Sequence, residues 1–118
     1  MLTVLTASDL LLKPPSRTVK FEGAGLDADV AFFVVDMDPG GGPEAHRHPY
    51  AEVFIPLSGT ALFQSGDERR EVGPGEIVVV GPEAEHGFTN VGEDRLNMVC
   101  IHAAGTMVTD WLDGRGFV

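Results

Sequence analysis

The sequence is poor in two kinds of residue that many functional classes require. It has one cysteine, Cys100, and eight lysine and arginine residues against 18 aspartate and glutamate residues in a chain of 118. A lone cysteine excludes an internal disulfide and a zinc finger built on paired thiolates. Nucleic acids are bound by clustered basic side chains, but the net charge is −10 and only Arg69 and Arg70 are adjacent. We therefore expect no nucleic-acid partner.

Long apolar runs are also missing. No stretch approaches the roughly 18 apolar residues that a membrane-spanning helix needs. The N-terminal stretch MLTVLTASDLLLK has Asp9 within its apolar part and no early basic cluster, so it is a poor secretory signal. We expect no membrane partner, a cytoplasmic location and, from the length, a single domain over residues 1–118.

Glycine and proline, by contrast, are plentiful and evenly spread. The 15 glycines and 8 prolines separate short segments rich in Val, Ile and Phe, namely 30–35, 52–63, 76–80 and 95–102. Such segments are too short and too β-branched for helices, and their regular spacing predicts an all-β sandwich or barrel. The only plausible helical pieces are near residues 7–12 and 106–112.

Two of the four histidines lie one residue apart in GGGPEAHRHPYAEVFIPLSG. His48 and Glu52 would share a helix face, but Pro49 and the following Val-Phe-Ile favour extended chain, on which His46, His48 and Glu52 share one side. His86 follows the next strand segment and can face the same cavity. Three imidazoles and one carboxylate suit Fe, Mn, Ni, Cu or Zn with positions left open. A solvated histidine pair in a loop is the alternative.

These residues resemble the two motifs of the cupin superfamily. The first, G(X)5HXH(X)3,4E(X)6G, is matched with every spacing at Gly40, His46, His48, Glu52 and Gly59. The second, G(X)5PXG(X)2H(X)3N, is matched at Gly75, His86 and Asn90, while Gly81 and Glu83 replace its proline and inner glycine. The departures lie in the turn before the last histidine and not at a ligand position.

The resemblance implies a fold, a cofactor and a partner. The fold would be an all-β double-stranded β-helix, a jelly-roll barrel. The metal ligands would be His46, His48, Glu52 and His86, holding one divalent transition metal per chain (Fe, Mn, Ni, Zn or Cu). Cupins commonly form homodimers, often by exchanging N-terminal strands, so a homodimer is expected.

Further residues are candidates for the reaction or for packing. Alternation along 95–102 puts His102 on the same face as Cys100, where it is either an edge histidine, which we favour, or a group that binds substrate or moves a proton. Tyr50 is a candidate cavity hydroxyl or an exposed loop residue. Cys100 is expected to be a small buried side chain. Trp111 is expected to pack on the barrel exterior or at a dimer interface, with a lid over the cavity as the alternative.

The predicted function is a metal-dependent enzyme acting on a small molecule, with a dioxygenase-like reaction first. A metal-dependent isomerase or lyase working through an enolate is the second hypothesis. A non-catalytic protein that holds a metal and binds a small ligand is the third, because one fold can host unrelated functions.

Overall fold

The computed structural model describes residues 1–112 and 116–117, and its regular structure is built from short antiparallel strands. The larger sheet has the order β1-β2-β9-β4-β7. Its members are β1 (Val19–Glu22), β2 (Ala31–Met37), β9 (Leu96–His102), β4 (Glu52–Ser58) and β7 (Val78–Val80). Strands distant in sequence are therefore neighbours, as a jelly roll requires.

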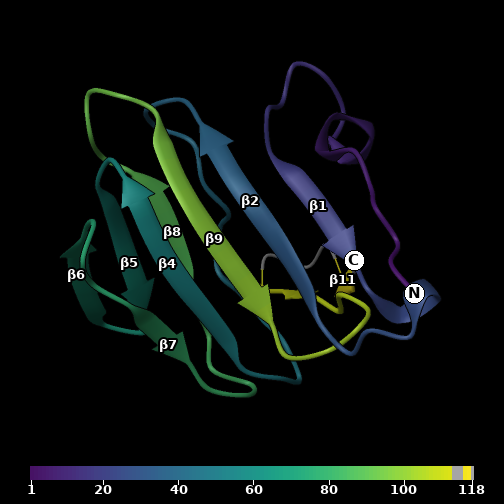
Figure 1. The fold of residues 1–118 in the computed structure, drawn as a ribbon. Coiled ribbons are helices and arrows are strands. Elements are labelled where there is room, and N and C mark those ends of the chain that lie inside the picture. The colour runs from purple at the N-terminus through teal and green to yellow at the C-terminus, as the bar shows by residue number, and fades with distance from the viewer. Residues whose placement is uncertain (113–115, 118) are drawn as a thin grey trace.

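Two three-stranded sheets complete the barrel. One has the order β6-β5-β8, and the other β11-β10-β3. Their members are β5 (Ala61–Ser65), β6 (Glu68–Val72), β8 (Gly87–Asn90), β3 (His46–Arg47), β10 (Asp110–Trp111) and β11 (Gly116–Phe117). In Figure 1 the N-terminal segment lies beyond β1, and β5 and β6 lie at the opposite side of the molecule. The all-β double-stranded β-helix expected from the sequence is confirmed.

The core lies between the larger sheet and the β6-β5-β8 sheet. Alternate residues of β9, namely Leu96, Met98, Cys100 and His102, are buried, as its alternation predicts. Phe54 of β4 packs edge-on against Phe63 of β5, with ring centroids 4.8 Å apart. Phe54, Phe63 and Phe88 are all buried and belong to this core.

The register between β4 and β9 positions polar residues at one end of this core. Glu52 is paired with His102, and Phe54 with Cys100. Both members of the first pair are buried. Because side chains on adjacent strands point to the same side at paired positions, the carboxylate and the imidazole meet inside the barrel.

Several boundaries differ from those expected. The segment 52–63 is two strands and not one, because the chain turns at Gly59, whose φ of +90° suits glycine. The expected helix near 106–112 is absent: Asp110 and Trp111 form β10 and pair with β3. The piece near 7–12 is a single 3-10 turn, η1 (Ala7–Leu10), and a second short turn is η2 (Ala24–Leu26). Among the described residues no helix is long and apolar enough to cross a membrane.

Candidate metal centre

Four buried side chains converge where β3, β4 and β8 begin. His46 opens β3, Glu52 opens β4 and His86 directly precedes β8. The backbones of His46 and His86 bond to each other, with N···O distances of 2.9 and 2.8 Å. One ligand atom from each of His46, His48, Glu52 and His86 lies within 4.8 Å of the others. The structure thus brings together the four residues that the sequence singled out.

The chain reaches this arrangement differently from what strand periodicity suggests. His46, His48 and Glu52 do not lie on one continuous strand, because β3 ends at Arg47 and β4 starts at Glu52. Pro49 has no N–H with which to continue a ladder, and the chain bends between the two strands. Alternation along 45–48 turns both His46 and His48 inward, and the bend at Pro49 and Tyr50 then brings Glu52, on the next strand, to the same place. Arg47 points away and bonds Asp110, with Nε 3.0 Å from Oδ2.

Backbone carbonyls orient each ligand imidazole. Nδ1 of His46 lies 2.7 Å from the Glu44 oxygen, Nδ1 of His48 lies 2.7 Å from the Val108 oxygen, and Nδ1 of His86 lies 2.9 Å from the Ala84 oxygen. A carbonyl only accepts, so each Nδ1 carries the proton. In the neutral ring, Nε2 then offers its lone pair to the cavity. Such contacts fix the ring orientation of metal-binding histidines.

The donor atoms fit a divalent transition metal. Nε2 of His48 and Nε2 of His86 lie 3.0 and 3.1 Å from Oε1 of Glu52. A nitrogen lone pair and a carboxylate oxygen that face each other repel unless a cation lies between them. Neighbouring ligands at right angles around a metal, with bonds of about 2.1 Å, are about 3.0 Å apart. The site can therefore bind a metal through these nitrogens and Oε1.

The charge states also suit a metal. Burial lowers the pKa of His46 to about 4, so this imidazole is neutral near neutral pH. Burial by itself raises the pKa of the Glu52 carboxyl, but the contact of its Oε2 with Nε2 of His102, at 3.1 Å, is the largest of those that outweigh burial and hold that pKa well below its usual range. A neutral imidazole and an ionised carboxylate are the forms that bind metals.

A cavity of about 300 Å³ opens onto three of these ligands, His46, His48 and Glu52. Most of its wall is apolar and includes Phe33, Val35, Met37, Phe54, Met107 and Trp111. The Trp111 ring lies 4.9 Å from the His46 ring, between centroids. Trp111 therefore lines the cavity of its own chain, where the sequence favoured exterior packing. Its place there follows from the pairing of β10 with β3.

His102 and Tyr50 meet beside the four ligands. His102 is only 1% exposed and lines the cavity, so it is not the edge histidine that the sequence favoured. The Tyr50 hydroxyl lies 2.6 Å from Nδ1 of His102 and accepts the Val108 N–H at 3.1 Å. Burial raises the pKa of Tyr50 to about 12, which keeps the hydroxyl protonated. His102 thus forms part of the cavity wall, whereas Tyr50 contacts His102 without lining the cavity itself.

Neither Cys100 nor Asn90 belongs to the ligand group. Cys100 is buried, and burial raises the pKa of its thiol well above the usual value, so it is the small buried side chain that was expected. Asn90 supports the turn after β8. Its amide donates to the Met37 and Asp94 carbonyls, and its side-chain oxygen accepts from the Gly92 N–H.

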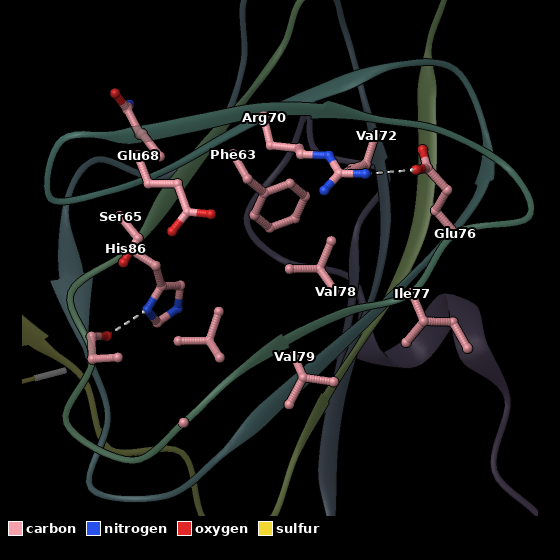
Figure 2. A pocket seen from close by; sticks show the side chains of 14 residues that line it. Phe63, Ser65, Glu68, Arg70, Val72, Glu76, Ile77, Val78, Val79 and His86 are labelled. Atoms are coloured by element: carbon pink, nitrogen blue, oxygen red, sulfur yellow. Dashed lines mark hydrogen bonds and ion pairs between the residues drawn. The ribbon is translucent and has the colours of Figure 1, made fainter.

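A second cleft, of about 360 Å³, lies between the β5–β6 hairpin and β7 (Figure 2). Phe63 and Val78 line it, and Arg70 pairs with Glu76 across it at 3.6 Å. Of the four ligands only His86 lines this cleft. Figure 2 shows the His86 ring at one end, bonded through Nδ1 to the Ala84 carbonyl. The cleft thus lies behind the metal centre and not over it.

Several residues of the site carry no recognisable signal in the sequence. The carbonyls that orient the imidazoles belong to Glu44, Ala84 and Val108, and any residue type can supply a carbonyl. Lys20 and Met107 line the cavity from segments outside both motifs. Only an alignment of related chains or the fold itself can reveal such positions.

A jelly-roll barrel in which three buried histidines and one buried glutamate converge defines a class, the small β-barrels with a candidate metal site. Comparison with known families is more specific. The family model of the cupin domain matches residues 33–102, and the chain belongs to the cupin family. No curated protein matches.

Solved structures support the same fold. A structure of oxalate oxidase in complex with the substrate analogue glycolate matches with a TM-score of 0.75 at 20% identity, over 92% of this chain and 63% of that one. The Lactobacillus farciminis oxalate decarboxylase formate complex matches with a TM-score of 0.76 at 18% identity, over 90% of this chain and 34% of that one. An uncharacterised double-stranded β-helix protein from Klebsiella pneumoniae matches with a TM-score of 0.70 at 19% identity, over 92% of this chain and 96% of that one. The chain thus spans less than two thirds of the oxalate oxidase chain.

Proposed function

We propose that this protein is a metal-dependent enzyme that acts on a small molecule. The observation that carries the proposal is the orientation of the ligand imidazoles. Three backbone carbonyls hold Nδ1 of the three imidazoles, and Nε2 of His48 and of His86 faces one oxygen of Glu52 beside a cavity. A solvated pair of loop histidines needs no such second contacts, and it would not be buried.

A dioxygenase-like reaction is the form we favour. His46, His48, Glu52 and His86 would hold one divalent transition metal, and this set suits Fe, Mn, Ni, Cu or Zn. When bound, a redox-active metal supplies coordination and electron transfer for O2 and for substrate oxygens. The chain itself contributes an apolar wall, which excludes water from the reacting groups.

Two other functions fit the same site. A metal-dependent isomerase or lyase would use the metal to stabilise an enolate. A non-catalytic binding protein would hold the metal and a ligand without turnover. The solved structures of this fold include oxalate oxidase and oxalate decarboxylases, which catalyse different reactions. The fold alone therefore does not choose the reaction.

The metal is tested by elemental analysis of protein prepared without an affinity tag. We expect about one transition metal per chain, and its loss in the double variant His48→Ala, Glu52→Ala. Arg47→Ala is the matched control, because Arg47 lies between two ligands in sequence but points outward to Asp110. Absence of metal in the wild type, or an unchanged metal content in the double variant, would contradict the proposal.

The reaction is tested on metal-loaded protein. Oxygen consumption with a panel of diols, enols and uronates identifies an O2-dependent reaction, and O2-derived oxygen in the product identifies it as that of a dioxygenase. Conversion of a panel member without oxygen uptake identifies an isomerase or lyase. No turnover, together with a rise in melting temperature on adding a panel member, identifies the binding protein.

We further propose that the chain forms a homodimer through its N-terminal segment. Leu2 and Val4 are 90% and 87% exposed, in extended chain ahead of η1. Neighbouring apolar side chains that are this exposed are typical of a surface that another chain covers. Light scattering should give twice the chain mass, and the double variant Leu2→Ser, Val4→Ser should give the mass of one chain. A monomeric wild type would contradict the proposal.

A further inference from the structure

The two oxygens of the Glu52 carboxylate face different partners. Oε1 is 3.0 Å from Nε2 of His48 and 3.1 Å from Nε2 of His86. Oε2 is 3.1 Å from Nε2 of His102. Glu52 and His102 are 4% and 1% exposed, so water contributes little to the solvation of either group. Protein groups therefore orient the carboxylate, and its second oxygen contacts an imidazole that is not one of the four candidate ligands.

Strand pairing keeps His102 beside Glu52. The two residues are directly paired in the register of β4 against β9, and β9 lies between β2 and β4 in the larger sheet. Side chains at paired positions stand on the same side of a sheet, with Cβ atoms about 5 Å apart. Because β9 has a neighbour on each side, the contact between these two residues is built into the sheet.

The neighbours of the His102 ring determine which of its nitrogens carries the proton. The Tyr50 oxygen accepts the Val108 N–H at 3.1 Å, so its own proton needs an acceptor. Nδ1 of His102 is 2.6 Å away, whereas Nδ1 of His48 is 3.4 Å away and already donates to the Val108 carbonyl. The hydroxyl therefore donates to Nδ1 of His102, and in the neutral ring the proton is on Nε2. The 3.1 Å contact thus joins an N–H to a carboxylate oxygen.

This proton position distinguishes His102 from the three candidate ligand histidines. In those three, Nδ1 carries the proton and Nε2 offers a lone pair to a metal. In His102 the order is reversed, because Nδ1 accepts from Tyr50 and Nε2 carries the proton. His102 is therefore a donor to Glu52 and is unsuited to bind a metal itself.

We propose that His102 is a positioning residue for Glu52 and that Tyr50 fixes the proton of His102 on Nε2. His102 holds Oε2, so Glu52 offers a metal only Oε1, the oxygen that faces His48 and His86. A carboxylate that binds through one oxygen occupies one coordination position, whereas one that binds through both occupies two. His102 thereby keeps a position open for a small molecule. The inference rests on the metal centre of the proposed function and extends it to the residues that orient a ligand.

Metal affinity tests whether His102 orients Glu52. Zn²⁺ is titrated into metal-free protein against a chelating indicator, and melting curves establish that each variant is folded at the assay temperature. His102→Leu should weaken Zn²⁺ binding by about 10–100-fold, the usual effect of removing a group that orients a metal ligand. His102→Gln keeps an N–H donor and should recover most of this loss. Met98→Ala is the matched control, because Met98 is buried on the same face of β9, and its Zn²⁺ affinity should be unchanged.

Infrared spectroscopy distinguishes an orienting role from a structural one. Difference spectra of metal-loaded minus metal-free protein, with ¹³C in the glutamate carboxyl groups, report how the ligand carboxylate binds. The separation between its antisymmetric and symmetric stretches is wide when one oxygen binds and narrow when both do. We expect a wide separation in the wild type and in His102→Gln. We expect a narrow one in His102→Leu, where Oε2 is free to turn towards the metal.

Nitrogen NMR of metal-free protein with ¹⁵N-labelled histidine tests the proton position without any metal. A ring nitrogen that carries a proton and one that carries a lone pair have well-separated chemical shifts. In the wild type, Nε2 of His102 should carry the proton. In Tyr50→Phe the proton should be shared between the two nitrogens, and Zn²⁺ affinity should fall by less than in His102→Leu.

Three results would overturn the inference. They are an unchanged Zn²⁺ affinity in His102→Leu, the same infrared separation in that variant as in the wild type, or a lone pair on Nε2 of His102 in the wild type. Wild-type protein that binds Zn²⁺ without dependence on His102 contradicts this inference alone, and one that binds no Zn²⁺ contradicts the proposed enzyme as well. The expected loss in His102→Leu, in a protein that turns over no member of the substrate panel, supports this inference and contradicts the proposed enzyme.

Discussion

Replacing Gly42 with alanine should destabilise the loop between β2 and β3 more than an added methyl group at any other position of that loop. Gly42 has φ +146°, and a Cβ built on it would lie 2.0 Å from the Phe88 carbonyl oxygen and 2.9 Å from its carbon. The obstacle is backbone and not the end of a flexible side chain. The loop cannot keep its place against β8, and His86 directly precedes that strand.

The cost has two parts. A residue with a side chain held at such a positive φ costs about 1–3 kcal/mol. Moving the loop away from β8 also strains two backbone hydrogen bonds, Gly40 N–H to the Asn90 oxygen and Asn90 N–H to the Gly41 oxygen, both 2.8 Å. Each is worth about 1 kcal/mol. Gly42→Ala should therefore lower the free energy of unfolding by about 3–5 kcal/mol.

Two matched variants separate strain from collision. Gly40 has φ +85°, but a Cβ added to it would have no other atom within 4 Å, so Gly40→Ala should show only the conformational cost of about 1–2 kcal/mol. Gly25 has neither a positive φ nor a near neighbour, and Gly25→Ala should be close to neutral. The assay is urea unfolding of metal-free protein, compared by midpoint at constant slope. Equal midpoints for Gly42→Ala and Gly40→Ala would refute the reasoning.

Three further outcomes are expected. Phe54→Ala should lower the free energy of unfolding, measured by denaturant titration, by about 3–5 kcal/mol, because Phe54 is 1% exposed and its ring packs against Phe63 and His86. A loss below about 1 kcal/mol would contradict this packing. Cys100 should resist iodoacetamide at about pH 8 in the folded protein and react in guanidinium chloride, because Cys100 is buried and burial raises the pKa of its thiol. Labelling is measured by mass spectrometry, and rapid labelling of the folded protein would contradict the burial of Cys100. Chelation of a bound metal should lower the melting temperature, because metal at a hundred times its dissociation constant stabilises the folded state by about 3 kcal/mol. A melting temperature that chelation leaves unchanged in a calorimetric scan would count against the site.

The strand segments and the ligand set follow from local features of the sequence. Alternation in 96–102 predicts which side of β9 faces the core, because a strand has a period of two whatever its neighbours are. The spacing of His46, His48 and Glu52, with His86 further on, identifies the residues that meet, since those side chains carry the chemistry themselves. Their roles as metal ligands stay a prediction until metal is measured.

Only the tertiary structure decided how those residues meet and what surrounds them. The contact of the Val108 carbonyl with His48 and the place of Trp111 depend on pairings between distant segments. The same holds for His102, whose burial and contact with Tyr50 follow from the register of β9 against β4. Sequence patterns encode what a residue prefers locally, whereas a cavity wall is made by residues that have no local relation to one another. The candidate ligands can therefore be identified from the sequence, whereas the cavity wall beside them is defined only by the folded barrel.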